Sequence, residues 1–190
     1  MDKGRMEAFS DGVVAILITI MVLGLNAPRE ASLAALGPLV PTFLSYVLSF
    51  VFLGIYWNNH HHLLQASERV DGLILWANLH LLFWLSLIPF STSWMGATNF
   101  STWPVALYGA ILLLSGFAYF LLERALIAQH GPDSRLATAL GADFKGKTSL
   151  VIYASAIPIA FFNAWISLGL YVVVALIWFV PDRRIEKTVL

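Results

Sequence analysis

Residues 5–25 read RMEAFSDGVVAILITIMVLGL, a stretch that joins a polar entrance to a long apolar run. Arg5, Glu7, Ser10 and Asp11 lie near its start, and no charged residue then follows before Arg29. A membrane-spanning helix needs about 20 predominantly apolar residues, so this stretch is long enough to cross a bilayer. An acid inside a membrane is costly and usually has a partner. The stretch therefore predicts a first membrane helix whose Asp11 is held by neighbouring helices.

The composition of the whole chain also indicates a membrane protein. Of its 190 residues, 59% are hydrophobic and only 12% are charged, and mean hydropathy is +0.78. A soluble domain carries about 25% charged residues. The formal net charge is +0, so no basic field attracts nucleic acid, and none is expected as a partner. The chain has no cysteine, which excludes disulfides and thiolate metal sites. We expect an all-α integral membrane protein surrounded by lipid.

Six membrane helices are predicted, forming one domain over residues 1–190. The last apolar stretch, residues 149–180, is too long for one straight span, and Asn163, Ser167 and Gly169 indicate a tight turn inside it. The last two helices are therefore expected to be short. Pro89 and Pro158 fall inside spans and are predicted to kink them. The predicted spans are residues 7–25, 41–64, 72–94, 104–127, 149–162 and 165–180.

The loop charges predict the orientation in the membrane. If the N-terminus is inside, ten of the 11 Lys and Arg residues lie in cytoplasmic segments, and only Arg29 lies outside. Lys and Arg are enriched in cytoplasmic loops. This bias requires an even number of spans, because an odd number would put Arg183, Arg184 and Lys187 outside. Both termini are therefore predicted to be cytoplasmic.

Helical periodicity divides the first helix into two faces. Ile16, Ile20 and Leu23 share one narrow apolar stripe, because residues i, i+4 and i+7 lie on the same side of a helix. Thr19 lies at the edge of this stripe, while Asp11 lies on nearly the opposite side. The ordinary interpretation of such a stripe is packing or lipid contact. The ordinary interpretation of Thr19 is a hydroxyl bonded back to its own helix.

Polar residues of the second and third predicted helices lie at the depth of Asp11, so we expect a polar layer that ties the first three helices together. Arg5 is expected to close this layer as a cation. Adjacent histidines on a helix point about 100° apart and cannot share one ion, so no metal site is expected. A proton relay through these histidines stays open. The layer would draw on Trp57, Asn58, Asn59, His60, His61, His62, Asn78 and His80.

The spacing R-x-x-x-F-S-D, formed by Arg5, Phe9, Ser10 and Asp11, resembles the signature of the transmembrane protein 175 family of potassium channels. The resemblance extends to the region from Trp57 to His61, to the number of spans, and to the string that begins at Asn78 and ends PFS. The C-terminal half matches only in hydropathy. The family includes bacterial members with one six-helix repeat, and this chain has one repeat.

The resemblance implies a potassium-selective or potassium-preferring channel in the bacterial inner membrane, assembled as a homotetramer around a four-fold axis. The first helix of each subunit would line the pore. The implied constriction falls on Ile16, Ile20 and Leu23, and the implied selectivity residue is Thr19. No cofactor is implied, and potassium is the permeant ion. The implied network behind the pore comprises Arg5, Phe9, Ser10, Asp11, Trp57, His61, Asn78 and His80.

The main alternative is a proton-coupled secondary transporter that uses Asp11 and the histidines of the second and third helices. Transporters often have broken helices near the midplane, and Pro89 and Pro158 fit that pattern. The chain is not expected to be an enzyme, because it lacks the H-E-x-x-H and G-x-S-x-G motifs.

Overall fold

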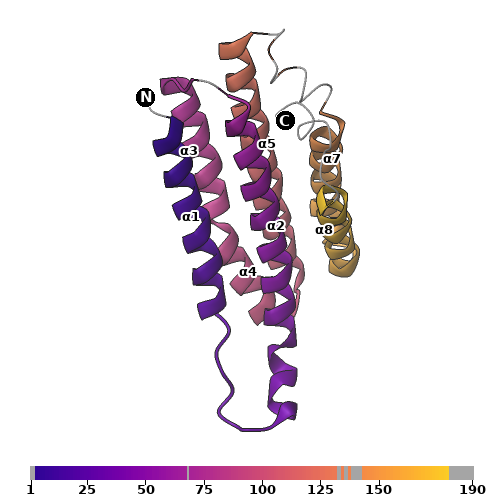
Figure 1. The fold of residues 1–190 in the computed structure, drawn as a ribbon. Coiled ribbons are helices and arrows are strands. Elements are labelled where there is room, and N and C mark those ends of the chain that lie inside the picture. Colours follow the sequence, from indigo (N-terminus) through magenta and orange to yellow (C-terminus); the bar gives the residue numbers. More distant parts are fainter. Residues whose placement is uncertain (1–2, 68, 132–133, 135–136, 138–142, 180–190) are drawn as a thin grey trace.

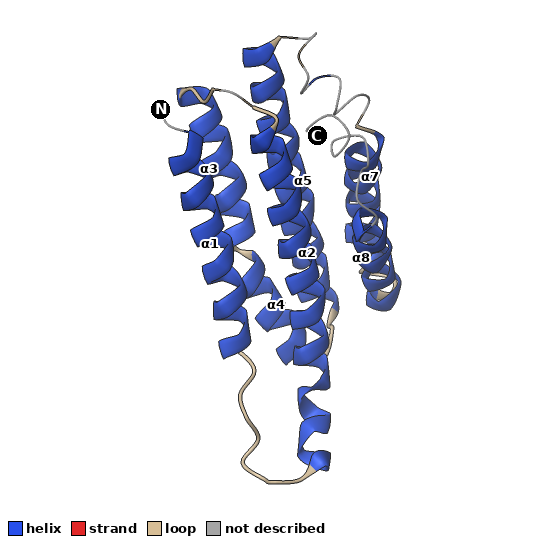
Figure 2. Cartoon of the chain, in the orientation of Figure 1, coloured by secondary structure: helices blue, strands red, loops and turns tan. Residues whose placement is uncertain are grey.

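The computed structural model describes residues 3–67, 69–131, 134, 137 and 143–179. These residues form helices and connecting turns, with no strand among them. Long helices run side by side, and a pair of shorter ones stands to one side of them (Figure 1). The same helical bundle is apparent when the chain is coloured by secondary structure (Figure 2). The helices are α1 (Lys3–Leu23), η1 (Leu33–Leu39), α2 (Val40–Gln65), α3 (Gly72–Ser86), α4 (Ile88–Ala97), α5 (Thr102–His130), α7 (Phe144–Ile159) and α8 (Ala164–Phe179).

Four described segments are long and apolar enough to cross a membrane: Lys3–Leu23, Leu33–Gln65, Gly72–Ala97 and Thr102–His130. Helices α7 and α8 have 16 residues each. At about 1.5 Å per residue, each rises roughly 24 Å, which is less than the hydrocarbon core of about 30 Å. The all-α membrane fold and the short final pair are therefore confirmed. The orientation of the termini stays a prediction.

The predicted span over residues 72–94 corresponds to one candidate membrane span, Gly72–Ala97, which consists of two helices instead of one kinked helix. It divides into α3 and α4 at Leu87, two residues before Pro89. Proline has no backbone N–H and clashes with the preceding turn, so α3 ends and α4 begins with this residue in its first turn. Pro158 lies in the last turn of α7 and precedes the turn into α8, and the kink at this residue stays a prediction.

The turn predicted between the last two helices is present at Ala160–Asn163. The backbone N–H groups of Phe162 and Asn163 both donate to the carbonyl of Ile159 at 2.9 Å, and the Asn163 side chain accepts from the N–H of Trp165. Helix α8 then returns along α7. Its Ser167 donates to the carbonyl of Ala156, and Trp178, near its end, donates to Ser149 near the start of α7.

The core of the bundle is centred on α5, which packs against α3, α4, α7 and α8. A chain of hydroxyls crosses this core at mid-depth. Thr92 donates to the carbonyl of Ile88 at 2.7 Å, so its oxygen accepts from Ser49 at 2.6 Å, and Ser49 in turn accepts from Tyr108 at 3.0 Å. Each of these three hydroxyls therefore has a partner, as buried polar groups usually do. The chain fixes α2, α4 and α5 in one register.

The close contact between α4 and α2 depends on Gly96. A Cβ placed there would lie 2.6 Å from Ser45 Oγ and 2.7 Å from Thr42 Cα, and the second of these is backbone that cannot turn aside. We predict that Gly96→Ala lowers the free energy of unfolding by about 1–3 kcal/mol, the usual cost of overpacking. Gly54 on α2 meets nothing within 4 Å. Gly54→Ala should therefore be neutral or slightly stabilising in the same denaturation assay, and equal effects of the two substitutions would contradict the prediction.

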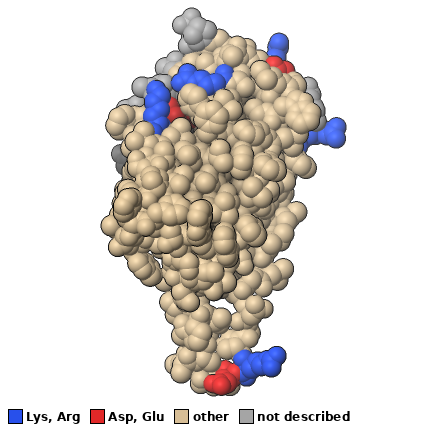
Figure 3. Space-filling view, turned by 180° about the vertical axis from the view of Figure 1, so that it is seen from behind, with Lys and Arg blue, Asp and Glu red and all other residues tan. Residues whose placement is uncertain are grey.

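Charged side chains gather at the two ends of the molecule, and a belt without them surrounds its middle on the face seen in Figure 3. The loop after α1 carries Arg29 and Glu30, both exposed. The start of α1 and the start of α7, at the opposite end in Figure 1, carry Lys3, Lys145 and Lys147. A central belt free of charge is what a bilayer core requires.

Candidate pore-facing helix and the network behind it

Helix α1 has one face packed against the bundle and one face left uncovered. Its buried residues follow helical spacing along one side, where α2, α3 and α4 contact it. These buried residues are Met6, Ser10, Val14, Leu17 and Met21. The apolar side chains on the other side, including Ile16, Ile20 and Leu23, are exposed in this chain. The bundle therefore holds α1 in one rotation about its axis.

The uncovered face carries the predicted stripe. The exposed fractions of Ile16, Ile20 and Leu23 are 57%, 49% and 77%. Thr19 is also exposed, and its hydroxyl donates to the carbonyl of Ile16 at 2.9 Å, as the ordinary interpretation predicts. This bond uses the hydroxyl hydrogen only. The lone pairs of the oxygen therefore stay able to contact a cation on the same face.

A buried hydrogen-bond chain ties the packed face of α1 to α3 and α2. Ser10 donates to the carbonyl of Met6 at 2.9 Å and accepts from the amide of Asn78 at 3.0 Å. The amide oxygen of Asn78 lies 2.7 Å from His60 Nε2, which therefore acts as the donor. Ser10, His60 and Asn78 are all buried. Since one amide links all three helices, Asn78 is the centre of this chain.

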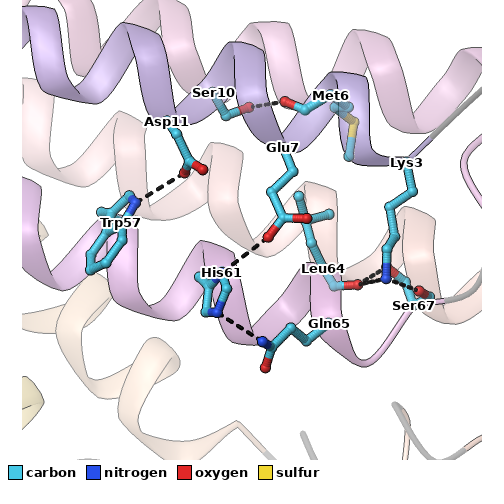
Figure 4. A network of polar contacts seen from close by, with 10 residues as sticks. All are labelled: Lys3, Met6, Glu7, Ser10, Asp11, Trp57, His61, Leu64, Gln65 and Ser67. Carbon is cyan, nitrogen blue, oxygen red and sulfur yellow. Dashed lines mark hydrogen bonds and ion pairs between the residues drawn. The ribbon is translucent and has the colours of Figure 1, made fainter.

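A second row of contacts joins α1 to α2 along their adjacent sides (Figure 4). The indole of Trp57 donates to Asp11 at 2.9 Å. One turn earlier on α1, Glu7 lies 3.0 Å from His61 Nδ1. The other ring nitrogen of His61 lies 2.8 Å from the amide nitrogen of Gln65. With Gln65 as the donor to that nitrogen, the Nδ1–H of His61 donates to Glu7.

Lys3 extends this row to the end of α2. Its ammonium donates to the carbonyl of Leu64 at 3.1 Å and to that of Ser67 at 3.0 Å (Figure 4). Carbonyl groups at the C-terminal end of a helix lack intrahelical donors, and a cation there also meets the negative end of the helix dipole. Lys3, Glu7 and Asp11 are four residues apart, so they form one ridge along α1.

The structure brings five of the predicted network residues into contact with their neighbours: Ser10, Asp11, Trp57, His61 and Asn78. Three others lie apart from them in this chain. Arg5 is exposed and bonds to no described residue, while Phe9 is mostly exposed. His80 is exposed and accepts from Trp84 on its own helix. Lys3, rather than Arg5, is the cation that bonds to the end of α2, and the role of Arg5 stays a prediction.

The sequence prediction did not include Lys3, Glu7 and Gln65. The four-residue spacing of Lys3, Glu7 and Asp11 is the signal that identifies the first two. The adjacent histidines do bond different neighbours, as their spacing predicts: His60 meets Asn78 and His61 meets Glu7.

Comparison with known proteins finds relatives whose names and descriptions all refer to ion channels. A family model described as endosomal/lysosomal potassium channel TMEM175 matches residues 5–89. A potassium channel of Chryseobacterium sp. (strain P1-3) is 53% identical over 188 residues, which cover 99% of this chain and 98% of that protein. The crystal structure of a lysosomal potassium-selective channel TMEM175 homolog from Chamaesiphon minutus matches with a TM-score of 0.81 at 26% identity, covering 95% of this chain and 97% of that one. The endosomal/lysosomal proton channel TMEM175 of Bos taurus is 38% identical over 81 residues, 36% of this chain and 17% of that protein.

The fold and these relatives define a cation channel of the membrane, a class of transport protein rather than of enzyme. The chain belongs to the TMEM175 family. It is a multi-pass bacterial membrane protein. The likeness covers nearly the whole chain, including the C-terminal half that the sequence motifs leave unmatched.

Proposed function

We propose that the chain forms a homotetrameric, potassium-preferring channel whose pore is lined by α1 of each subunit. One observation carries this proposal: α1 presents an uncovered apolar stripe on the side opposite its buried polar contacts. A lipid-facing helix needs no such buried anchoring, whereas a helix that lines a pore must keep a fixed rotation. The name of the Chryseobacterium relative, a potassium channel, supports the same function.

Gating by wetting and dewetting fits the side chains on the stripe. In a tetramer, Ile16, Ile20 and Leu23 would each form an apolar ring. A narrow apolar neck empties of water and thereby blocks ions. The network behind α1 would set the radius of these rings, because Ser10 and Asp11 hold the helix from the opposite side. Potassium is the permeant ion in this proposal and not a resident cofactor.

Thr19 is proposed to favour potassium by offering its hydroxyl oxygen in place of lost hydration. Thr19→Val keeps the shape and removes this oxygen. One lost polar contact of about 1 kcal/mol would lower the potassium-to-sodium permeability ratio about fivefold. The ratio is measured from reversal potentials under a potassium–sodium gradient. Ser155 is an exposed hydroxyl that likewise bonds back to its own helix, so Ser155→Ala is the matched control. An unchanged ratio in Thr19→Val would contradict the role of this residue.

The natural absence of cysteine allows a direct test of the pore face. Leu23→Cys and Leu176→Cys each place one thiol at an exposed leucine, the first on α1 and the second on α8. A positively charged thiol reagent should abolish potassium flux from liposomes containing the first variant and leave the second unaffected. Oxidation should also join two subunits through Cys at position 23 alone. Equal inhibition of both variants would contradict a pore lined by α1.

Proton transport is the second candidate, either conducted or coupled to a substrate. The specific observation in its favour is the row of titratable groups between α1 and α2, where His61 meets Glu7 and Trp57 meets Asp11. The Bos taurus relative is named a proton channel. A proton-coupled transporter would show saturable uptake of a substrate without unitary currents, whereas a channel would show the currents.

A further inference from the structure

A cavity of about 50 Å³ lies between α2, α5 and α7, away from the face proposed to line the pore. No residue of α1 lines it. Its walls are largely aromatic, with Phe52 and Tyr56 from α2, Phe120 from α5, Tyr153 from α7 and Trp178 from α8. A water molecule needs at least about 10–15 Å³ of such space, so the cavity has room for one small ion with a few waters.

The carboxylate of Glu123, on α5, lines this cavity and has no hydrogen-bond or ion-pair partner among the described residues. Glu123 is 5% exposed, and it accepts no hydrogen bond from any described residue. The adjacent Arg124 does not pair with it; the Arg124 guanidinium lies over the ring of Phe120, 4.9 Å from its centroid. A buried carboxylate without a partner is among the costliest groups in a protein. The Glu123 carboxylate is therefore expected to bind either a cation or a proton.

Two tyrosine hydroxyls on the same cavity are also without a bond to the described residues. They belong to Tyr56 and Tyr153, and Tyr153 is only 3% exposed. Three other tyrosines of the bundle have partners: Tyr108 bonds Ser49, Tyr119 donates to the carbonyl of Asn59, and Tyr171 donates to the carbonyl of Val105. Two phenolic oxygens and one carboxylate therefore line the same cavity.

The donor set defines the kind of ligand. One free carboxylate and two phenolic oxygens favour a positive charge, and aromatic faces attract weakly hydrated cations. The other acid on the cavity, Asp143, is engaged at the start of α7, where it accepts from the N–H of Gly146 at 3.1 Å. Calcium takes six to eight oxygen ligands, often with several carboxylates, and zinc prefers nitrogen and sulfur. These residues therefore provide neither the carboxylates that calcium prefers nor the nitrogen and sulfur ligands that zinc prefers.

We propose that this cavity is a second cation site, separate from the pore, in which Glu123, Tyr56 and Tyr153 bind one small monovalent cation of the size of potassium or ammonium. A cation here joins α2, α5 and α7 and offsets the charge of the buried carboxylate. The site does not depend on the proposed channel function. If the protein binds the cation here but passes no current, the proposed channel function fails and the proposed cation site remains supported.

Thallium, which replaces potassium and scatters anomalously, tests the site directly. Crystals of the full chain soaked in thallium should show an anomalous peak beside the Glu123 carboxylate, and the Glu123→Gln variant should lack it. A peak confined to the α1 face, or no peak beside Glu123 in the unaltered protein, would overturn the proposal. If Glu123→Gln fails to fold, Tyr153→Phe provides the second variant, in which we expect a weaker peak at the same place.

Thermal unfolding distinguishes a cation from a proton on Glu123. Replacing N-methylglucamine by potassium or ammonium at constant ionic strength should raise the unfolding temperature by roughly 3 °C, since a ligand of the folded state stabilises it. Glu123→Gln should lose most of this rise. Glu30→Gln, at an exposed acid in the loop after α1, should retain it. An unchanged rise in Glu123→Gln would place the stabilising cation elsewhere, and no rise in the unaltered protein would favour a proton on the carboxyl. Either result would overturn the proposal.

Discussion

Ile16→Asn is expected to raise the potassium current of the reconstituted channel about tenfold, which corresponds to a barrier lowered by about 1.4 kcal/mol. The reason is that four amides would replace four apolar side chains at the proposed constriction. An amide keeps water in a narrow neck, whereas a branched apolar side chain expels it. The measurement is the unitary current and open fraction in a bilayer with equal potassium on both sides.

Ile166→Asn is the matched control for this substitution. Ile166 lies on α8 and is 53% exposed, close to the 57% of Ile16, so the two changes place the same amide at equally uncovered positions of the chain. The control should leave the current unchanged. If Ile16→Asn also leaves it unchanged, this residue does not form the constriction. If both variants raise it, the effect comes from general loosening of the bundle.

Asn78→Ala is expected to cause the largest loss of stability among the network substitutions. It removes the acceptor of buried His60 and the donor to buried Ser10 at once. Leaving a buried polar group without a partner costs about 1–3 kcal/mol, and the deleted volume adds to this, so the free energy of unfolding should fall by about 2–4 kcal/mol. Because α1 also loses its anchor to α3, the current should become unstable. Chemical denaturation and bilayer recording of the same preparation measure the two effects.

Two further substitutions provide a comparison for the loss of unfolding free energy in Asn78→Ala. Asn58 is an exposed amide on α2, and Asn58→Ala should change the free energy of unfolding by less than about 0.5 kcal/mol. Asp11→Ala should fall between the two, because the half-buried Asp11 carboxylate has one bond, from Trp57. If Asp11→Ala costs more than Asn78→Ala, the main anchor of α1 is the row along α2 and not the buried chain through α3.

Much of the fold follows from hydropathy and charge in the sequence. The apolar run after Gly12 is long enough to predict a membrane-spanning helix. The turn before α8 follows from the excessive length of residues 149–180. The break at Leu87 is harder to predict from the sequence, because a proline inside an apolar run can either kink a membrane helix or divide it. Packing of α4 against α2, which depends on Gly96, decides between these outcomes.

The exposed stripe of α1 can be predicted from the sequence because one helix alone determines it, and its role in a pore stays a prediction. The stripe of Ile16, Ile20 and Leu23 follows from helical periodicity, and the structure leaves it uncovered. The partners across helices are harder to predict, because they depend on the rotation of each helix about its axis. Arg5 and Lys3 are both cations at the start of α1, two residues apart. Only the rotation of the helix brings Lys3, rather than Arg5, to the carbonyls at the end of α2.

Bilayer recording of the purified chain under a potassium–sodium gradient tests the central claim most directly. The account predicts discrete currents that reverse toward the potassium potential, and these currents should respond to changes at Ile16 and Thr19. A silent bilayer, together with saturable and proton-dependent uptake of a substrate into liposomes, would contradict the channel. That result would assign function to the row formed by Asp11, Glu7 and His61.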